Sequence, residues 1–328
     1  MKIKGRLIVL TKPGKIKFAK IEMDASRLKS DEIAAKTLYS AISSGTETAA
    51  YSGKPALRPG KAYPRLVGYC NAAVALNVGA KVKKFRPGDL ILSGESHRSL
   101  FKIKETDIFA KIPKQLDPGK AALAYLYNLG LSSLLPAKDK KNPSIAVIGL
   151  GVIGLGVVEQ AAISGYETYA LSDSRNKLKL AKKLGAEKVF LKNKIGKIEK
   201  LADIVVLTSD SWVDWRLALR LAKPYGAISV IGFPGRNSGA PDFNPLEPKY
   251  FYDKKIAIIP IGWDYGVENS GKINKKNCGK ILELMKRRKL HPENLISGIF
   301  SYEKIESAYE KLLARDGKSI TYLLKWPA

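Results

Sequence analysis

The sequence predicts an α/β protein in which a β-rich N-terminal half precedes a doubly wound parallel sheet. Residues 1–115 contain short apolar runs separated by turns such as Pro13-Gly14 and Pro87-Gly88. From residue 145 onward, apolar strands alternate with helices, which is typical of a parallel sheet covered on both faces. The 328 residues suffice for two domains, and the content of 45% apolar and 27% charged residues is that of a folded, soluble protein.

The N-terminal half supplies the first four predicted strands. Each is a short run of apolar and β-branched residues, and glycine and proline punctuate the sequence around them. They are expected at residues 6–11, 33–42, 70–78 and 90–93.

The second half supplies the parallel sheet and a tail. Its first strand, at 145–148, is a continuous apolar run of the kind found in strands buried on both faces. Gly185 stands where a left-handed cap would end a basic amphipathic helix. Further strands are expected at residues 167–171, 189–191, 204–207, 227–231, 256–261 and 319–325, and helices at residues 151–164, 176–184, 214–222, 277–289 and 302–313.

This order divides the chain into three segments. Residues 1–118 form the β-rich domain, residues 119–265 the parallel-sheet domain, and residues 266–328 a tail that is expected to pack back on the N-terminal half. No internal repeat or low-complexity linker is found, so crossing helices are expected to join the domains.

A glycine motif follows the first strand of the parallel sheet. Residues 149–154 read GLGVIG, which is the G-x-G-x-x-G spacing, and the strand and helix around them match the context that this spacing needs. Gly149 permits a tight turn, Gly151 lets the backbone approach a pyrophosphate, and Gly154 lets the helix pack closely on the strand. The motif predicts a Rossmann domain that binds a dinucleotide at the helix N-terminus. The expected phosphate contacts come from Gly149, Gly151, Val152, Ile153 and Gly154.

The end of the second strand is expected to meet the adenosine ribose. Counting along this strand gives Ser172 at that position, with Asp173 next. Ser172 with Arg175 and Lys177 nearby would accept a 2′-phosphate, so NADP(H) is favoured over NAD(H); a shift of one residue would bring Asp173 to the ribose and reverse the preference. Arg175 and Lys177 can alternatively be solvated helix residues. The expected cofactor-binding set is completed, after the fourth and fifth strands, by Ser209 and Gly232.

The composition indicates which cellular compartment and which classes of binding partner suit this protein. No signal-peptide core or membrane span of about 20 apolar residues is found. Cys70 and Cys278 are the two cysteines, too few for a disulfide framework, so a cytoplasmic location is expected. The net charge of +27 would suit nucleic acid, an anionic membrane or an acidic small molecule. Because the lysines are dispersed along the chain, a solvated basic surface is the favoured interpretation.

Five segments, taken with the order of elements, resemble the medium-chain dehydrogenase/reductase superfamily over nearly the whole chain. This resemblance implies a GroES-like catalytic domain before the Rossmann domain, and an NAD(P)(H)-dependent oxidoreductase. The segments are SGTE at 44–47, VGY at 67–69, FRPGD at 85–89, the glycine motif at 149–154 and KLKLAKKLG at 177–185.

The metal-ligand positions that the resemblance implies differ from those of the zinc enzymes. Zinc alcohol dehydrogenases of the superfamily carry C-G-T-D and G-H-E, where this chain has Ser44, Tyr69 and Cys70. A hydroxyl and a phenol are poor zinc ligands. The lobe that carries a structural zinc in many members would follow Asp89 and is missing. We expect no zinc; the S-x-G-T-E form and the missing lobe also resemble, weakly, the bacteriochlorophyllide dehydrogenase branch.

Without zinc, hydrogen-bond donors must stabilise the alkoxide that forms during hydride transfer. By resemblance, Thr46 matches a proton-relaying hydroxyl and Tyr69 replaces a ligand that faces the nicotinamide, although Tyr69 can also simply line or pack the pocket. Ser43 and Ser44 are donors or turn residues, and Glu47 orients the site or has a structural role. By resemblance, the loop that carries His97 approaches the cleft, but a position at the surface is the favoured interpretation.

Three functions remain open. The favoured one interconverts an alcohol and a carbonyl on a small substrate, either anionic or neutral; the second reduces an enone C=C bond. The third, from another class, is a cofactor-binding protein whose basic surface binds RNA or another polyanion, and it is disfavoured because aromatic residues do not interleave with the lysines. The resemblance also implies a homodimer through the edge strand between Ile256 and Ile261.

Overall fold

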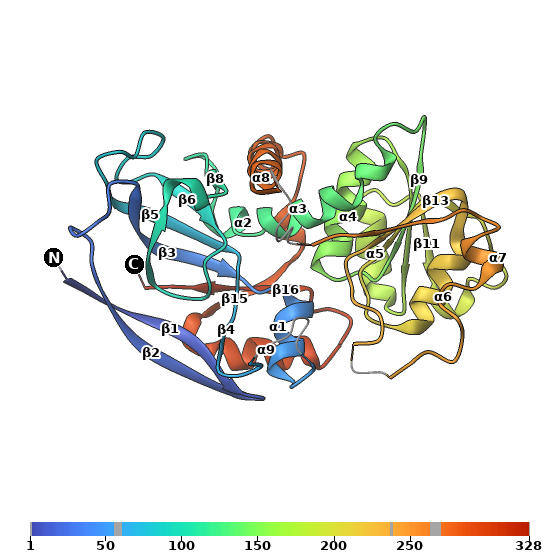
Figure 1. Ribbon diagram of the computed structural model, residues 1–328, viewed down its shortest axis with the longest axis horizontal. Coiled ribbons are helices and arrows are strands. Elements are labelled where there is room, and N and C mark those ends of the chain that lie inside the picture. Colours follow the sequence, from blue (N-terminus) through green and yellow to red (C-terminus); the bar gives the residue numbers. More distant parts are fainter. Residues whose placement is uncertain (1, 56–60, 237–238, 263–269, 328) are drawn as a thin grey trace. The chain divides into compact units, whose positions relative to one another are not determined.

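The computed structural model describes residues 2–55, 61–236, 239–262 and 270–327. Two compact units make up the chain: unit 1 comprises Met1–Asn128 and Asp264–Ala328, and unit 2 comprises Leu129–Trp263. The chain therefore leaves unit 1 once and returns to it (Figure 1). Residues 119–128, which the sequence-based division assigned to the parallel-sheet domain, group with unit 1. Within the described ranges, no helix combines the length and apolar character that a membrane span requires.

Unit 2 contains a parallel sheet of six strands in the order β11-β10-β9-β12-β13-β14. Its helices lie on either side of this sheet (Figure 1). Strands β10 and β12 flank β9, so the strand order reverses at β9, which is where ligands bind in open α/β sheets. Every strand and helix predicted for this half is present, with ends that shift by one to several residues. The strands are β9 (Ser144–Ile148), β10 (Glu167–Ser172), β11 (Lys188–Leu191), β12 (Ala202–Leu207), β13 (Ala222–Val230) and β14 (Ala257–Pro260), and the helices are α4 (Val152–Ile163), α5 (Arg175–Lys183), α6 (Trp212–Leu221) and α7 (Pro248–Phe251).

Unit 1 is built mainly from antiparallel strands. One sheet has the order β2-β1-β4, and the other has the order β15-β16-β3-β5-β6-β8, with β7 pairing with β3. The antiparallel unit and the parallel Rossmann unit together confirm the predicted fold class. The strands are β1 (Lys2–Lys12), β2 (Lys15–Asp24), β3 (Glu32–Ala41), β4 (Arg65–Leu66), β5 (Asn71–Val78), β6 (Leu90–Ser93), β7 (Leu100–Lys104), β8 (Ala110–Lys111), β15 (Ile296–Ser301) and β16 (Thr321–Lys325).

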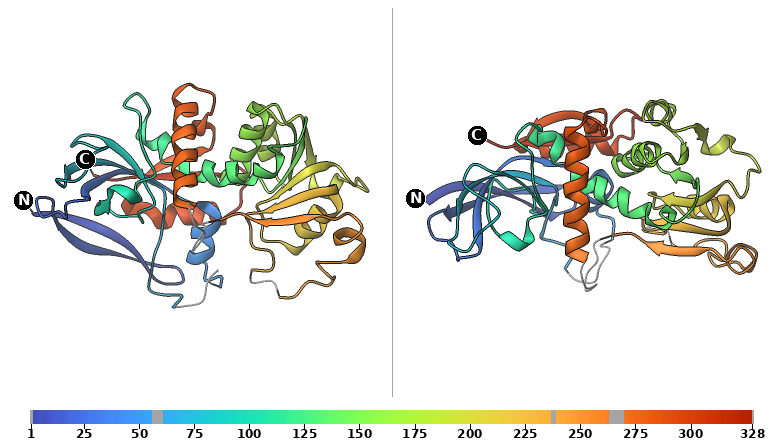
Figure 2. Two further views of the ribbon diagram at one scale, coloured as in Figure 1. Left: turned by 45° about the horizontal axis from the view of Figure 1, so that its top comes forward. Right: turned by 90° about the horizontal axis from the view of Figure 1, so that it is seen from above.

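The longer helices of unit 1 come from both ends of the chain. Helix α8 is seen nearly end-on in Figure 1 and along its length in Figure 2. Helix α9 lies beside α1, and β16 pairs with β3, so the tail packs on the N-terminal half (Figure 1). The helices are α1 (Ser44–Tyr51), α2 (Pro118–Ala121), α3 (Ala124–Ser133, which continues into unit 2), α8 (Ser270–Lys286) and α9 (Ile305–Leu313).

One hydrophobic cluster of unit 1 includes Ala50 and Tyr51, in the last turn of the helix that begins with the SGTE segment. It joins Ile8 of β1 and Ile42 at the end of β3 to Tyr309 of α9 and Leu324 of β16, all of which are fully buried. Residues from the two ends of the sequence therefore fix the position of α1, which carries three of the four candidate catalytic residues, namely Ser44, Thr46 and Glu47.

Candidate functional site

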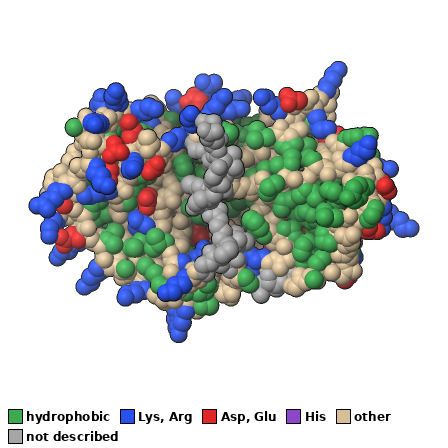
Figure 3. All heavy atoms as spheres, in the orientation of Figure 1, with side chains coloured by type: hydrophobic (Ala, Val, Ile, Leu, Met, Phe, Trp, Pro, Cys, Tyr) green, Lys and Arg blue, Asp and Glu red, His purple; other side chains and the backbone are tan. Residues whose placement is uncertain are grey.

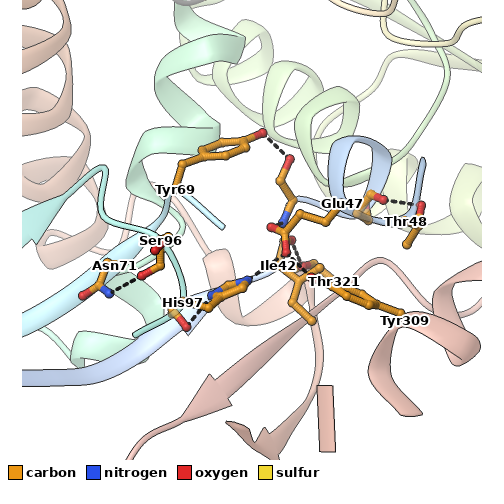
Figure 4. A network of polar contacts seen from close by, with 12 residues as sticks. Ile42, Glu47, Thr48, Tyr69, Asn71, Ser96, His97, Tyr309 and Thr321 are labelled. Atoms are coloured by element: carbon orange, nitrogen blue, oxygen red, sulfur yellow. Dashed lines mark hydrogen bonds and ion pairs between the residues drawn. The ribbon is translucent and has the colours of Figure 1, made fainter. Parts of the chain in front are cut away.

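The Tyr69 phenol lies against the start of α1. Its hydroxyl hydrogen-bonds the Ser43 hydroxyl (Figure 4). Burial raises the pKa of Tyr69 far above its ordinary value, and hydrogen bonds from the Ser43 and Thr46 side chains offset part of that rise. The structure therefore brings Tyr69 and Thr46 together, as the sequence suggested, but Ser43 rather than Ser44 supplies the hydroxyl that the phenol contacts.

Glu47 points into the core of unit 1, where its side chain is 2% exposed. Its Oε1 accepts a hydrogen bond of 2.7 Å from the backbone amide of Ser43. Its Oε2 lies 2.8 Å from His97 Nε2 and accepts a hydrogen bond of 2.7 Å from the Tyr309 hydroxyl (Figure 4). Glu47 is thus connected to the site through Ser43, while its carboxylate is held by groups from two other segments.

His97 is completely buried, so its expected place at the surface is wrong. Its Nδ1 lies 2.8 Å from the Ser40 hydroxyl. The ring packs against Gly68, where a Cβ atom would come within 2.6 Å of it. Gly68 has φ +84°, so this close contact requires glycine both for space and for conformation.

The residues at the implied metal-ligand positions are a donor set that suits zinc poorly. Cys70 is fully buried, and this burial raises the pKa of its thiol well above the usual value, which disfavours the thiolate that zinc binds. Tyr69 is engaged with Ser43. Over the described part of the chain, no three His, Cys, Asp or Glu side chains are placed to hold a metal ion together.

The three motif glycines in unit 2 are each constrained differently. Gly149 has φ +92°, outside the usual range of other residues. A Cβ atom at Gly154 would lie 2.0 Å from the carbonyl oxygen of Gly149, so the helix packs directly on the turn. A Cβ atom at Gly151 would meet no described atom within 4 Å. Gly151 is also the N-cap of α4 and no side chain caps this helix, so the first-turn amides, those of Val152 and Ile153 included, fit the phosphates of a dinucleotide.

The carboxyl ends of the central strands meet beside this motif. A Cβ atom at Gly149 would lie 2.5 Å from Thr208 Oγ1, and one at Gly232 would lie 2.1 Å from the Ser209 carbonyl oxygen. The structure thus brings together the ends of β9, β12 and β13, and with them three of the residues predicted to bind the cofactor.

Lys192, which sequence reasoning missed, connects the end of β10 with α6. Its ammonium lies 2.7 Å from Asp173 and 2.9 Å from Asp214, and the Ser209 hydroxyl donates to Asp214. Burial lowers the pKa of Lys192, but hydrogen bonds and charges from the two carboxylates outweigh burial and raise it. Lys192 could have been identified from the sequence because it directly follows strand β11, at the carboxyl edge of the sheet.

The other predicted ribose-end residues follow β10. Ser172 ends this strand, is 6% exposed, and accepts a hydrogen bond from the Ser174 amide. Arg175 begins α5 as an exposed residue, and it makes no ion pair within the described residues. Lys177 donates its amide to Ser174, the N-cap of the same helix.

Comparison with known proteins gives matches along the chain. The zinc-binding dehydrogenase family matches residues 152–270. Sorbitol dehydrogenase of Bacillus subtilis (strain 168) is 25% identical over 65% of this chain and 58% of its own length. The 2-methylene-furan-3-one reductase of Solanum lycopersicum is 25% identical over 76% of this chain and 61% of its own length. The match thus spans about three fifths of the length of each of these two relatives.

A solved structure shows the same fold over almost all of the chain. The crystal structure of L-idonate 5-dehydrogenase from Escherichia coli K-12 MG1655 superposes with a TM-score of 0.83 at 13% identity, covering 99% of both chains. By the family match over residues 152–270, these relatives and this fold, the chain is similar to members of the medium-chain dehydrogenase/reductase superfamily.

Proposed function

We propose that this protein is an NADP(H)-dependent oxidoreductase that interconverts an alcohol and a carbonyl without catalytic zinc. The observation that carries the proposal is the Tyr69 phenol, held by Ser43 and Thr46 at a position where the zinc enzymes of the superfamily have a metal ligand. A phenol in this place can serve as the hydrogen-bond donor that a zinc-free site needs.

Unit 2 binds the dinucleotide in this proposal. The uncapped N-terminus of α4 receives the diphosphate, and the missing Cβ of Gly151 leaves room for it. When bound, the dinucleotide supplies or accepts the hydride.

Unit 1 supplies the proton. Because burial raises the pKa of Tyr69, the phenol stays protonated at neutral pH and acts as a donor rather than a base. As it donates to the substrate oxygen, its own oxygen accepts hydrogen bonds from the Ser43 and Thr46 hydroxyls. These bonds stabilise the negative charge that develops on the phenol, so the two hydroxyls assist the donor without touching the substrate.

The preference for NADP(H) is supported by the charges after β10. Asp173, the residue that would repel a 2′-phosphate, is paired with Lys192 at 2.7 Å. Arg175 is exposed near the same end of the strand and makes no ion pair with the described residues. A 2′-phosphate would therefore meet uncompensated positive charge here.

Zinc independence is supported by the chemistry of Ser44, Tyr69 and Cys70, as described above. We expect prolonged treatment with a chelator to leave turnover unchanged, and added zinc not to raise it.

A second candidate is reduction of the C=C bond of an enone, favoured by the likeness to the 2-methylene-furan-3-one reductase. Carbonyl reduction and C=C reduction both need a proton donor near the substrate, so the geometry of unit 1 does not discriminate between the two reactions. The net charge of +27 favours an anionic substrate in both cases, because the surface field attracts it.

The proposed enzyme is a cytoplasmic homodimer. Cys70 and Cys278 are free and buried, which suits a reducing compartment. Strand β14 lies at the edge of its sheet, and apolar side chains gather over it on the face seen in Figure 3. A second copy pairing along this edge would cover both the strand and the apolar surface.

The test is a substrate panel with a matched variant. The full-length protein is assayed with NADPH and NADH against ketones, sugars and enones, alongside Tyr69→Phe. We expect carbonyl reduction with NADPH, a loss of roughly 10²-fold to 10³-fold in kcat for Tyr69→Phe, and unchanged NADPH affinity by calorimetry. Exclusive reduction of enones would establish the second candidate instead, and full activity in the variant would remove Tyr69 from the mechanism.

A further inference from the structure

We propose that Glu47, His97 and Tyr309, here called the Glu47 clamp, are positioning residues that hold Ser43 in place, so that its hydroxyl is directed at Tyr69. This inference rests on the proposed function, because it assumes that Tyr69 is the proton donor. It concerns three buried groups that do not touch the substrate and act through Ser43 and through the backbone segment that carries Tyr69.

The first argument is that Ser43 departs from ordinary helix capping. A serine at the N-cap normally accepts a hydrogen bond from an amide of the first turn through its side chain. Ser43 is the N-cap of α1, but its side chain makes no capping bond. Instead the carboxylate of Glu47, four residues further on, accepts the Ser43 amide at 2.7 Å, one residue beyond the position that a capping box uses. The hydroxyl is thereby free of the helix and contacts Tyr69.

The second argument comes from counting donors at Glu47. One oxygen accepts the Ser43 amide, and the other meets both His97 Nε2 and the Tyr309 hydroxyl at 2.8 and 2.7 Å. Burial raises the pKa of Tyr309 well above its usual value, and the neighbouring Glu47 raises it further, so this phenol remains a donor. The carboxylate therefore has a single geometry in which all three bonds are made, and that geometry fixes the Ser43 amide.

The third argument is the direction of the hydrogen bonds that reach His97. Trp326 Nε1 can only donate, and it donates to Ser40 Oγ at 2.9 Å. Ser40 then has its own proton to give to His97 Nδ1, 2.8 Å away. We assign the remaining ring proton to Nε2, which donates to Glu47 (Figure 4). Through this chain of hydrogen bonds, the buried side chains of Trp326, Ser40 and His97 direct one N–H donor at the Glu47 carboxylate.

The fourth argument is that the clamp also touches the segment of Tyr69. The His97 ring packs on Gly68, the residue before Tyr69, and any side chain at Gly68 would displace it. The His97 amide also donates to the Val67 carbonyl at 2.8 Å. One imidazole therefore contacts the backbone that carries the phenol while it holds the carboxylate that carries Ser43. The two partners of the Ser43–Tyr69 hydrogen bond are fixed to the same group.

The main test compares two tyrosines that each lose one hydroxyl. Tyr309→Phe removes a donor from Glu47, whereas Tyr302→Phe removes a hydroxyl that donates to Glu303, outside the clamp. We expect Tyr309→Phe to lower kcat about tenfold with NADPH and the best substrate of the panel, while KM and NADPH affinity stay within about twofold. Tyr302→Phe is expected to match the wild type in all three.

A second pair of variants tests the role of the donor at His97. The amide of His97→Gln can still donate to Glu47, whereas His97→Leu cannot. We expect His97→Gln to retain more kcat than His97→Leu at matched melting temperature. Equal activity of the two would contradict the clamp, because a structural core position would respond to size rather than to donation.

A third measurement does not depend on turnover. Amide hydrogen exchange of residues 43–47 is measured on the full chain. Faster exchange in Tyr309→Phe than in Tyr302→Phe supports the clamp. Equal exchange in the two variants overturns it. If the wild type reduces no substrate, the proposed function fails and exchange alone decides whether Ser43 is held. If the wild type is active but Tyr309→Phe and His97→Leu keep full kcat, the clamp is rejected and the proposed function stands.

Discussion

Two of the motif glycines in unit 2 differ in what surrounds their missing side chains. A Cβ atom at Gly154 would collide with backbone at 2.0 Å, while one at Gly151 would point into space that no described atom occupies. Gly151 has φ −80° and ψ −170°, which any residue can adopt. Gly154 is therefore required by the fold, whereas the open space at Gly151 fits the proposed approach of a ligand.

This difference predicts opposite outcomes for two alanine variants. Gly154→Ala must push backbone apart, and we expect it to lower the stability of unit 2 by about 3 kcal/mol. Gly151→Ala is expected to have the melting temperature of the wild type. It is expected to bind NADPH at least about tenfold more weakly, a loss of about 1.4 kcal/mol in binding free energy. Calorimetry measures both quantities. Unchanged NADPH affinity in Gly151→Ala would contradict binding of the diphosphate at this turn.

The residues of the site differ in how far sequence alone could identify them. The glycine motif lies within six consecutive residues, and its spacing carries the physical requirement directly. Glu47 reaches partners that are 50 and 262 residues away, so no local pattern connects them. His97 looked like a surface residue because the glycine that makes room for its ring is remote in the sequence from it. Sequence alone did not decide between Ser43 and Ser44 as the donor, because only the helix geometry determines which hydroxyl is free.

At the scale of elements, one carboxylate ties three neighbouring strands of the parallel sheet. Asp203 of β12 accepts hydrogen bonds from the amide and hydroxyl of Ser144, at the start of β9, at 3.0 and 2.6 Å. It also accepts one of 3.0 Å from Lys223 of β13. Partial burial raises the pKa of Asp203, but these contacts outweigh burial and lower it from 3.8 to about 2.

A folded pKa below the unfolded value means that Asp203 stabilises the fold above about pH 4 and loses this contribution as pH falls toward 2. We expect Asp203→Asn to lower stability by about 1–2 kcal/mol at pH 7, and the gap to the wild type to close between pH 4 and pH 2. Denaturant titrations across this range measure it. The control is Asp242→Asn, which removes an exposed ion pair with Arg216 and is expected to change little. A gap that is independent of pH would assign the effect to packing instead.

The elements of the two units were predictable to different degrees. In unit 2, the central strands β9 and β12 are largely buried apolar runs, each followed by a helix, so local sequence was sufficient for them. In unit 1, strand β2 was missed although its residues alternate between polar and apolar on both sides of Ala19, a pattern that could have revealed it. Strand β15 pairs with β16, and β16 with β3, and these partners become evident only when the two ends of the chain meet.

At the scale of the whole molecule, the net charge of +27 decides how salt acts on each proposed partner. Lysine and arginine side chains are scattered over the face shown in Figure 3 rather than gathered into one patch. Two copies of such a chain repel each other at long range, and this repulsion acts over the Debye length, about 10 Å at 0.1 M salt. Binding of a polyanion, in contrast, gains from the release of counterions and weakens steeply as salt is added.

The proposed homodimer should therefore become tighter as salt rises from low to moderate concentration, because screening removes repulsion while the apolar edge contact is unaffected. Sedimentation velocity at a series of salt concentrations measures the dissociation constant. Ala257→Lys places a new charge at an exposed position of edge strand β14, and across a two-fold axis the two new lysines would approach each other. Since juxtaposed like charges cost several kcal/mol, we expect this variant to be monomeric at concentrations where the wild type is dimeric. Dimerisation that weakens with salt, or that survives in Ala257→Lys, would place the contact on another surface.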